Sequence, residues 1–149
     1  MQTTPQPRAS SSSSSTSAEI AVVEEFFAAF QALDLDRALE LLADDVVYQN
    51  VPFPADRGKA AVTRTLRGFG KVMTGFEVQM KNIASNGRIV LTERVDVLKA
   101  PIADLELWVC GTFEVQGGRI VLWRDYFDVA SAAAQVVTGP FRKLFGRKR

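Results

Sequence analysis

The sequence predicts an α+β fold in which a curved, mixed or antiparallel sheet wraps around N-terminal helices to form a cone. Helical periodicity dominates as far as Val72, whereas an extended period of two dominates from Phe76 onward. The dipeptides Asn86-Gly87 and Gly117-Gly118 have the chemistry of tight hairpin turns and divide the extended half. A single layer of strands needs cover, so we expect the helices to close the concave face of the sheet over an apolar pocket.

The first helix is predicted to begin near Thr16, because Thr16 and Glu19 have capping-box spacing. A second helix is expected at 35–42, before a turn at Asp44-Asp45. The later elements are expected, in order, as a short strand at 46–51, a helix at about 59–72, strands at 76–85, 88–98, 105–115 and 119–129, and a short helix at about 131–137.

One folded domain is predicted at 18–138, between a flexible serine-rich tail at 1–17 and a basic tail at 139–149. The chain has 149 residues, 47% of them hydrophobic, which suits a single core. Its net charge of +1 is too small to favour the binding of nucleic acid through a general electrostatic attraction. No apolar run approaches the ~18 residues that cross a bilayer, and no apolar segment follows the serines as a secretory signal requires.

The absence of histidine excludes Ser-His-Asp and Cys-His nucleophile systems and any histidine-based metal site. The one cysteine, Cys110, cannot form an internal disulfide, which favours a reducing, cytoplasmic setting. Its strand context indicates simple packing. No phosphate-binding loop or metal-ligand cluster is present, so we expect neither a cofactor nor a metal.

Two strands place charged side chains on apolar faces. Because strand side chains alternate, Arg94 and Asp96 share one face, and Asp125 shares another with Trp123 and Phe127. Burying a carboxylate costs several kcal/mol unless the group is paired or protonated. If the two hairpins pack in one sheet with these faces together, Arg94 lies between Asp96 and Asp125.

The short strand adds Tyr48 and Asn50, which are two apart and therefore on one face. The polar residues predicted to face the cavity are thus Tyr48, Asn50, Arg94, Asp96 and Asp125. For any one of them, a satisfied buried ion cluster or a solvated face is the more ordinary interpretation. Their joint placement on inward faces favours a catalytic site.

At these residues the chain resembles the limonene-1,2-epoxide hydrolase family. The resemblance covers about Ile20 to Val129. It depends on three segments, namely Tyr48–Asn50 followed by Pro52–Pro54, Thr92–Leu98 and Trp123–Asp128. Each segment is a weak motif alone, but their order and spacing make the set specific. The connection after Lys99 looks shorter than is usual in the family.

The resemblance implies a cone of the nuclear-transport-factor-like and ketosteroid-isomerase-like kind, usually dimeric. It implies that Asp96 is the general acid that protonates the epoxide oxygen and that Asp125 is the general base. Tyr48 and Asn50 would hold the attacking water, and Arg94 would bridge the carboxylates. The expected reaction is one-step hydrolysis of a lipophilic epoxide to a vicinal diol, with no enzyme ester, since histidine, the usual partner for hydrolysing such an ester, is missing.

Two other functions fit the same scaffold: an isomerase or cyclase, and a non-catalytic carrier of a lipophilic ligand. Neither explains two buried aspartates joined by an arginine. The residues expected to contact the substrate are Leu98, Leu107, Val109, Trp123 and Phe127, with Val121 on the same inward face as Trp123. They indicate a lipophilic epoxide without choosing among terpene, fatty-acid and sterol epoxides.

Two interactions beyond the substrate are expected. A homodimer is predicted through the outer face of the sheet, because Ile89, Leu91, Val95 and Val97 would otherwise leave an exposed apolar patch. The C-terminal segment 141–149 mixes aromatic and basic residues, which suits weak contact with anionic membrane surfaces, although a solvated tail is the simpler interpretation.

Overall fold

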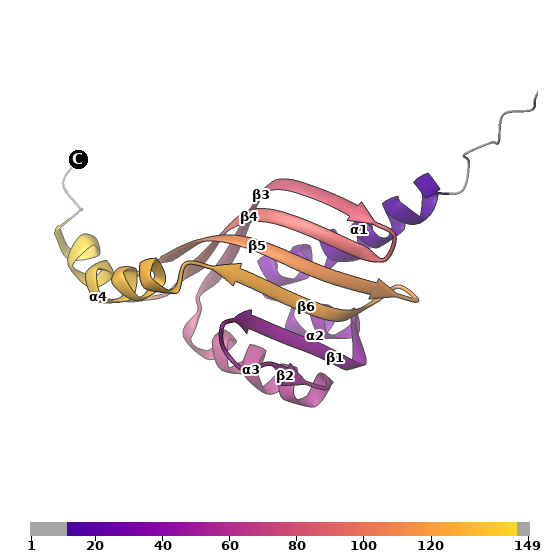
Figure 1. The fold of residues 1–149 in the computed structure, drawn as a ribbon. Coiled ribbons are helices and arrows are strands. Elements are labelled where there is room, and N and C mark those ends of the chain that lie inside the picture. The colour runs from indigo at the N-terminus through magenta and orange to yellow at the C-terminus, as the bar shows by residue number, and fades with distance from the viewer. Residues whose placement is uncertain (1–11, 146–149) are drawn as a thin grey trace, which may run out of the picture.

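The computed structural model describes residues 12–145 as one α+β assembly of a sheet and four helices (Figure 1). In chain order the elements are α1 (Ser12–Gln31), α2 (Leu35–Glu40), β1 (Leu42–Val51), β2 (Asp56–Arg57), α3 (Lys59–Val72), β3 (Gly75–Asn86), β4 (Ile89–Lys99), β5 (Leu105–Gln116), β6 (Arg119–Phe127) and α4 (Val129–Phe145). The predicted fold class and the alternation of helices and strands are confirmed.

The six strands form one sheet in the order β2-β1-β6-β5-β4-β3. Strands β3 to β6 are an antiparallel meander, whereas β1 lies parallel to β6, so the sheet is mixed. Helix α1 contacts β3 to β6, and α3 contacts β1 and β2. The three N-terminal helices therefore cover one face of the sheet, and α4 lies at one end of it (Figure 1).

The two hairpin turns differ in type. At the second, Gln116 pairs with Arg119, and both Gly117 and Gly118 have positive φ, of 58° and 77°, as a type I′ turn requires. At the first, Asn86 already pairs with Ile89, so the turn residues are Gly87 and Arg88, and only Gly87 has positive φ. The prediction that placed this turn at Asn86-Gly87 is therefore wrong by one residue.

Two further predictions need correction. Helix α1 begins at Ser12 rather than near Thr16, so Ser12–Ser15 of the serine run are helical, while residues 1–11 of the predicted tail lie outside the described residues. Asp44 and Asp45 are not a turn but part of β1, where the pairing with β6 shifts register between Leu42 and Val47. This irregularity leaves both aspartates unburied within an otherwise continuous strand.

Helix α4 is longer than the predicted 131–137 segment and takes in the first part of the predicted basic tail. It passes through Pro140, which has no N–H to donate to the preceding turn. Just before the proline, Gly139 packs so closely on the β4–β5 loop that an added Cβ would lie 2.6 Å from Ala103 Cβ. Residues 146–149 lie outside the described residues.

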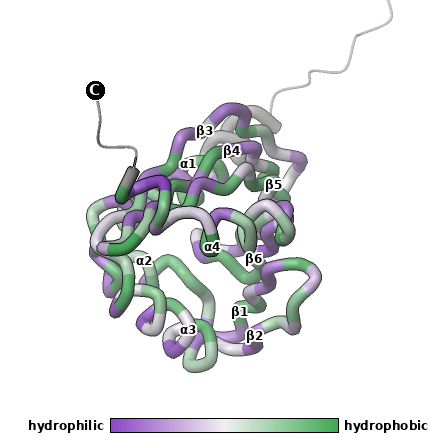
Figure 2. Tube along the Cα trace, turned by 90° about the vertical axis from the view of Figure 1, so that its left-hand side faces the viewer, coloured by the Kyte–Doolittle hydropathy of each residue, from purple (hydrophilic) through white to green (hydrophobic). Residues whose placement is uncertain are grey.

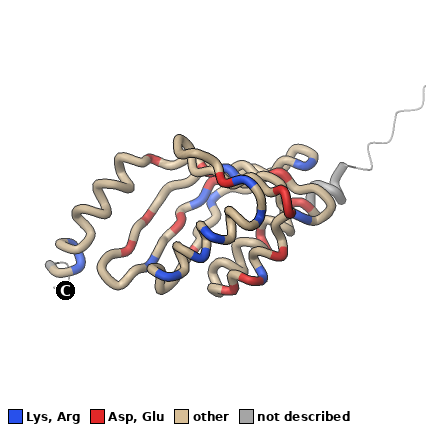
Figure 3. Tube along the Cα trace, turned by 90° about the horizontal axis from the view of Figure 1, so that it is seen from below, with Lys and Arg blue, Asp and Glu red and all other residues tan. Residues whose placement is uncertain are grey.

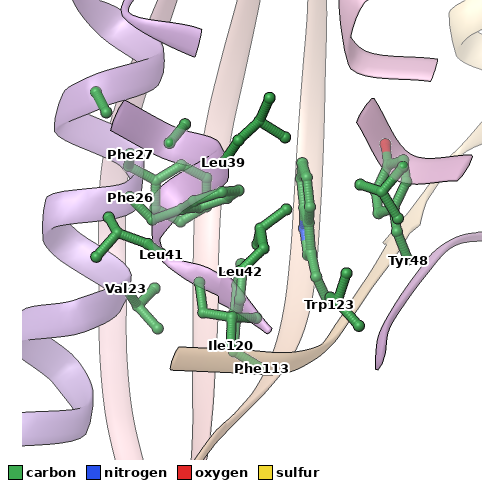
Figure 4. Close-up of a cluster of buried hydrophobic side chains, with 14 of the residues drawn as sticks. Val23, Phe26, Phe27, Leu39, Leu41, Leu42, Tyr48, Phe113, Ile120 and Trp123 are labelled. Atoms are coloured by element: carbon green, nitrogen blue, oxygen red, sulfur yellow. The ribbon is translucent and has the colours of Figure 1, made fainter. Parts of the chain in front are cut away.

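An aromatic core joins α1 to the sheet (Figure 4). The Phe26 ring is fully buried and meets Phe30 and Trp123 edge-on, with centroid separations of 4.9 and 5.0 Å. Trp123 in turn packs against Tyr48 at 4.1 Å and stacks on Phe113 at 6.1 Å. Such ring contacts are directional, so this core fixes how α1 lies across β5 and β6.

Several exposed large apolar residues lie in α4 or the β4–β5 loop, at the end of the sheet that faces the viewer in Figure 2, namely Ile102, Val136, Val137, Phe141 and Leu144. None of the helices that the structure describes combines the length and the hydropathy needed to span a bilayer.

Candidate active site

Three strands deliver the predicted polar residues to the same face of the sheet. Asn50 of β1 lies in register with Asp125 of β6, and Tyr48 lies in register with Trp123. Asp125 is separated from β4 by the intervening strand β5, so a side chain from β4 must cross β5 to reach it. The residue of β5 in register with Asp125 is Gly111, whose missing side chain leaves this crossing open.

Arg94 of β4 makes that crossing and is fully buried, with 0% of its surface exposed. Its Nε donates to Asp96 Oδ1 and Oδ2 at 2.9 and 3.1 Å, and its Nη2 donates to Asp125 Oδ2 at 2.7 Å. The remaining nitrogen, Nη1, donates to Thr92 Oγ1 at 2.9 Å. The Phe27 ring covers the guanidinium at 4.6 Å, which adds a cation–π contact.

Asp125 receives a second donor from its own strand. Trp123 Nε1 donates to Asp125 Oδ2 at 2.8 Å, so two hydrogen bonds converge on that oxygen. The other oxygen, Oδ1, is buried and has no hydrogen-bond partner among the described residues. Asp125 therefore keeps one carboxylate oxygen available to a further group.

Burial acts on the protonation of both carboxyl groups. Burial raises the pKa of Asp96 to about 6, although the charge and hydrogen bonds of Arg94 oppose the change. Burial also raises the pKa of Asp125, against the opposing effects of Arg94 and the hydrogen bond from Trp123. Because the pKa of each carboxyl is raised, the pair can retain a proton under conditions in which free aspartates are ionised.

Tyr48 and Asn50 are linked to each other beside this pair. Asn50 Nδ2 donates to Tyr48 Oη at 2.5 Å. Burial, followed by the nearby charge of Asp125, raises the pKa of Tyr48, so its hydroxyl stays neutral and retains its proton. The Tyr48 O–H and the Asn50 carbonyl oxygen can therefore bind a small polar molecule.

These groups line a cavity of about 200 Å³ that is partly open to the surface. Its walls include all five residues predicted to contact a substrate, together with Tyr48, Asn50, Asp96 and Asp125. Arg94 is not part of the cavity wall but lies behind the aspartates. Val121 also does not face the cavity: the register shift between β5 and β6 leaves Val121 unpaired, and Ile120 turns into the core instead.

The sequence reasoning missed the part of the wall that the helices supply. This part comprises Phe30 of α1, Leu66 and Phe69 of α3, and Met73 and Phe76, which follow α3. The apolar stripe of α3 was visible in the sequence, but which cavity it faces depends on how the helix packs.

Gly111 and Thr92 were also missed as parts of the ion cluster. A Cβ on Gly111 would lie 2.5 Å from Arg94 Nη1, 2.7 Å from Asp125 Oδ1 and 2.7 Å from Thr92 Oγ1. The available signal was a glycine inside a strand pattern, which often marks a close approach of other atoms to the backbone.

No group of three or more cysteine, aspartate or glutamate side chains within the described part of the chain is arranged to hold a metal ion. The polar side chains at the cavity are the two carboxyls and the tyrosine–asparagine pair, with the arginine behind the carboxyls.

Comparison with known proteins identifies the family of this chain. Residues 17–137 match the family described as the limonene-1,2-epoxide hydrolase catalytic domain. The chain is 48% identical over 108 residues to epoxide hydrolase EphG of Mycobacterium tuberculosis, covering 72% of this chain and 71% of that protein. The chain belongs to the limonene-1,2-epoxide hydrolase family and is an epoxide hydrolase.

Solved structures agree with this assignment. A structure described as an M. tuberculosis LEH-like epoxide hydrolase matches with a TM-score of 0.80 and 40% identity, covering 88% of this chain and 98% of that one. A putative polyketide cyclase from Xanthomonas campestris has a TM-score of 0.69 at 24% identity, covering 82% of this chain and 98% of that one. The second likeness shows the fold alone, so the enzyme class depends on the family and not on the scaffold.

Replacing Gly111 by alanine should destabilise the protein by about 1–3 kcal/mol, because the new methyl group overlaps Arg94, Thr92 and Asp125 in a packed interior. Urea denaturation measures the effect. Gly68→Ala is the matched control. Gly68 lies within α3, where alanine is tolerated better than glycine, and an added Cβ there meets nothing within 4 Å. If Gly111→Ala and the unmodified protein were equally stable, the space between Gly111 and the Arg94 side chain that crosses β5 would be large enough for a methyl group.

The raised pKa of Asp96 predicts how stability changes with pH. A carboxyl whose pKa is higher in the folded than in the unfolded state stabilises the fold at low pH, and this contribution is lost as pH rises through the folded value. Relative to Asp96→Asn, the unmodified protein should therefore lose on the order of 2 kcal/mol between about pH 4 and pH 7. Thermal denaturation of both proteins across this range measures the difference, and parallel curves would contradict the assignment.

Proposed function

We propose that the enzyme hydrolyses a lipophilic epoxide to a vicinal diol in one displacement by water, with Asp96 as acid and Asp125 as base. The observation that carries the proposal is the buried Asp96–Arg94–Asp125 bridge at the wall of an apolar cavity. Asp96 gives its proton to the epoxide oxygen as the C–O bond breaks. Water forms the new C–O bond on the opposite side and loses a proton to Asp125.

The hydrogen bonds of the two aspartates support these roles. Burial raises the pKa of both carboxyls, so the pair can hold the proton that Asp96 donates at a higher pH than free aspartates would. Asp125 accepts two hydrogen bonds on Oδ2, which favour its ionised form, and its free Oδ1 can accept a proton. When the diol leaves, moving one proton from Asp125 to Asp96 restores the starting state.

The water is assigned to Tyr48 and Asn50. Tyr48 Oη accepts from Asn50, so its own O–H remains free to donate to water, and the Asn50 carbonyl can accept from it. Both residues lie in the strand next to Asp125. A tyrosine and an amide that can hold water support direct attack more than an oxyanion-stabilised ester, as does a chain without histidine.

Asp96→Asn and Asp125→Asn should each lower kcat for epoxide opening by at least about 10²-fold, because an amide is neither acid nor base. Diol formation from a panel of terpene, fatty-acid and sterol epoxides is the measurement. The control is Asp128→Asn, since the exposed Asp128 caps α4 and asparagine can cap equally well. Near-normal turnover by Asp125→Asn would refute its role as base.

A single turnover in water enriched in heavy oxygen, with enzyme in excess over epoxide, distinguishes direct attack by water from a route through an enzyme ester. Direct attack places the label in the first diol. An ester on Asp96 or Asp125 would give an unlabelled first diol and leave the label in the protein.

We also propose a homodimer through the outer face of the sheet. Of the predicted residues, Leu91 is exposed, Ile89 and Val97 are half-buried, and Val95 is already buried within the subunit. Trp108 and Tyr126, 57% and 45% exposed, extend the patch over β5 and β6. Exposed aromatic side chains on adjoining strands suit an interface core.

Light scattering at micromolar concentration should give twice the subunit mass, and Trp108→Glu should give the mass of one subunit. A single-subunit mass for the unmodified protein would refute the dimer.

The cytoplasmic location and the contact of segment 141–149 with membranes remain predictions. Val137, Phe141 and Leu144 give α4 an exposed apolar side beside Arg142 and Lys143, which suits a membrane surface.

A further inference from the structure

Thr92 is a buried residue that belongs to the ion cluster but has no part in the reaction proposed above. The charged residues of the chain are spread over its helices and strands (Figure 3). Apart from aromatic residues, the polar and charged residues that are buried within residues 12–145 are Thr92, Arg94, Asp96 and Asp125. Three of these form the Asp96–Arg94–Asp125 bridge, and Thr92 is the uncharged fourth.

The Thr92 hydroxyl holds one end of the Arg94 guanidinium. Thr92 lies two residues before Arg94 on β4, and Asp96 lies two residues after it, so all three side chains share the inner face of the sheet. Arg94 Nη1 donates to Thr92 Oγ1 at 2.9 Å, and Arg94 Nε donates to Asp96 Oδ1 at 2.9 Å. The guanidinium is thus held from both directions along its own strand. Its Nη2 points off the strand, across β5, to Asp125 at 2.7 Å.

The other neighbours of the guanidinium confine it without aiming its N–H groups. The Phe27 ring centroid lies 4.6 Å from Arg94 Cζ, and a Cβ on Gly111 would lie 2.5 Å from Arg94 Nη1. A ring face and a backbone Cα limit where the guanidinium can lie, but neither accepts a directional hydrogen bond in its plane. The direction in which Nη2 points therefore depends on the hydrogen bonds to Thr92, Asp96 and Asp125.

Two of these three partners change charge during the proposed reaction. Asp96 becomes negative when it gives its proton to the epoxide oxygen, while Asp125 becomes neutral when it takes a proton from water. A hydrogen bond from a guanidinium to a carboxylate is stronger than one to a neutral carboxylic acid. The changing charges therefore draw Arg94 toward Asp96 and away from Asp125. Thr92 is the partner whose charge stays constant throughout.

We propose that Thr92 is a positioning residue that anchors Arg94 while charge moves between the two aspartates, an inference that rests on the proposed function. The Thr92 hydroxyl keeps the outer end of the guanidinium in place, so that Nη2 stays aimed at Asp125. Thr92 is not part of the wall of the catalytic cavity, so it acts through Arg94 and not on the epoxide. Its loss should slow the chemical step and leave substrate binding unchanged.

Thr92→Val keeps the branched shape of the side chain and removes the oxygen that accepts from Arg94. The variant should lower kcat for epoxide opening by about ten- to a hundredfold, because Asp125 is then less precisely held. KM should stay within about twofold of its original value, as expected when only the reacting groups are displaced. Thr92→Ser keeps the hydroxyl and should retain most of the activity. Equal losses of kcat in the two variants, or an effect on KM alone, would overturn the proposal.

Thr112→Val is the matched control, because it makes the same exchange on the neighbouring strand. Thr112 follows Gly111 on β5, so its side chain faces the opposite side of the sheet from the ion cluster. It lies there beside the exposed Leu91, at the outer surface. Thr112→Val should leave kcat nearly unchanged. A loss of kcat as large as that of Thr92→Val would show a general effect of the exchange on the sheet and would overturn the proposal.

Trp123 provides a second readout that needs no substrate. Its Nε1 donates to Asp125 Oδ2, the oxygen that also accepts from Arg94, so its fluorescence should change when Asp125 gains or loses a proton. The chain has two tryptophans, and Trp108→Phe leaves Trp123 as the single reporter. A pH titration of fluorescence in this background gives an apparent pKa for the aspartate pair. Tyr48 also lies beside Asp125, but its raised pKa keeps it neutral during the titration.

Thr92→Val in the same background should raise this apparent pKa by about half a unit or more, because a less firmly held Arg94 opposes the effect of burial less. Thr92→Ser and Thr112→Val should leave the apparent pKa unchanged. An unchanged or lower pKa in Thr92→Val would overturn the proposal, even if that variant turns over slowly. A raised pKa, together with no hydrolysis of any epoxide by the unmodified protein, would instead contradict the proposed function and support the role of Thr92 in holding Arg94.

Discussion

The buried guanidinium of Arg94 is the charge on which both the site and the inner face of the sheet depend. Its nitrogens donate to Asp96, Asp125 and Thr92, and Phe27 of α1 covers its plane. Removing a buried countercharge leaves two carboxylates unpaired at a cost of several kcal/mol. The contacts that make the bridge tolerable in the interior therefore also hold the two aspartates in place.

The Asp96–Arg94–Asp125 bridge joins two strands of the sheet, β4 and β6, that are not direct neighbours. Asp125 and Arg94 are on strands that do not pair with each other, and β5 lies between them. Gly111 leaves the guanidinium room to pass over β5, while Trp123 supports Asp125 from within its own strand and also packs on Phe26. The aromatic core and the ion cluster thus share a residue, so the position of α1 and the geometry of the site are coupled.

The helices decide what the site can bind. The strands supply the polar groups of the cavity, whereas Phe30, Leu66 and Met73 form the part of its wall that lies toward the helices.

What the sequence determined by itself is local. The period of two along a strand places Arg94 with Asp96, and Trp123 with Asp125, so the polar residues of the cavity and its apolar partners could be predicted. Tertiary structure decided what depends on distant segments: the parallel pairing of β1 with β6, the bulge that turns Val121 away, and the position of Gly111 beneath Arg94. These features follow from which strands become neighbours and how helices pack across them, and no short-range pattern encodes that choice.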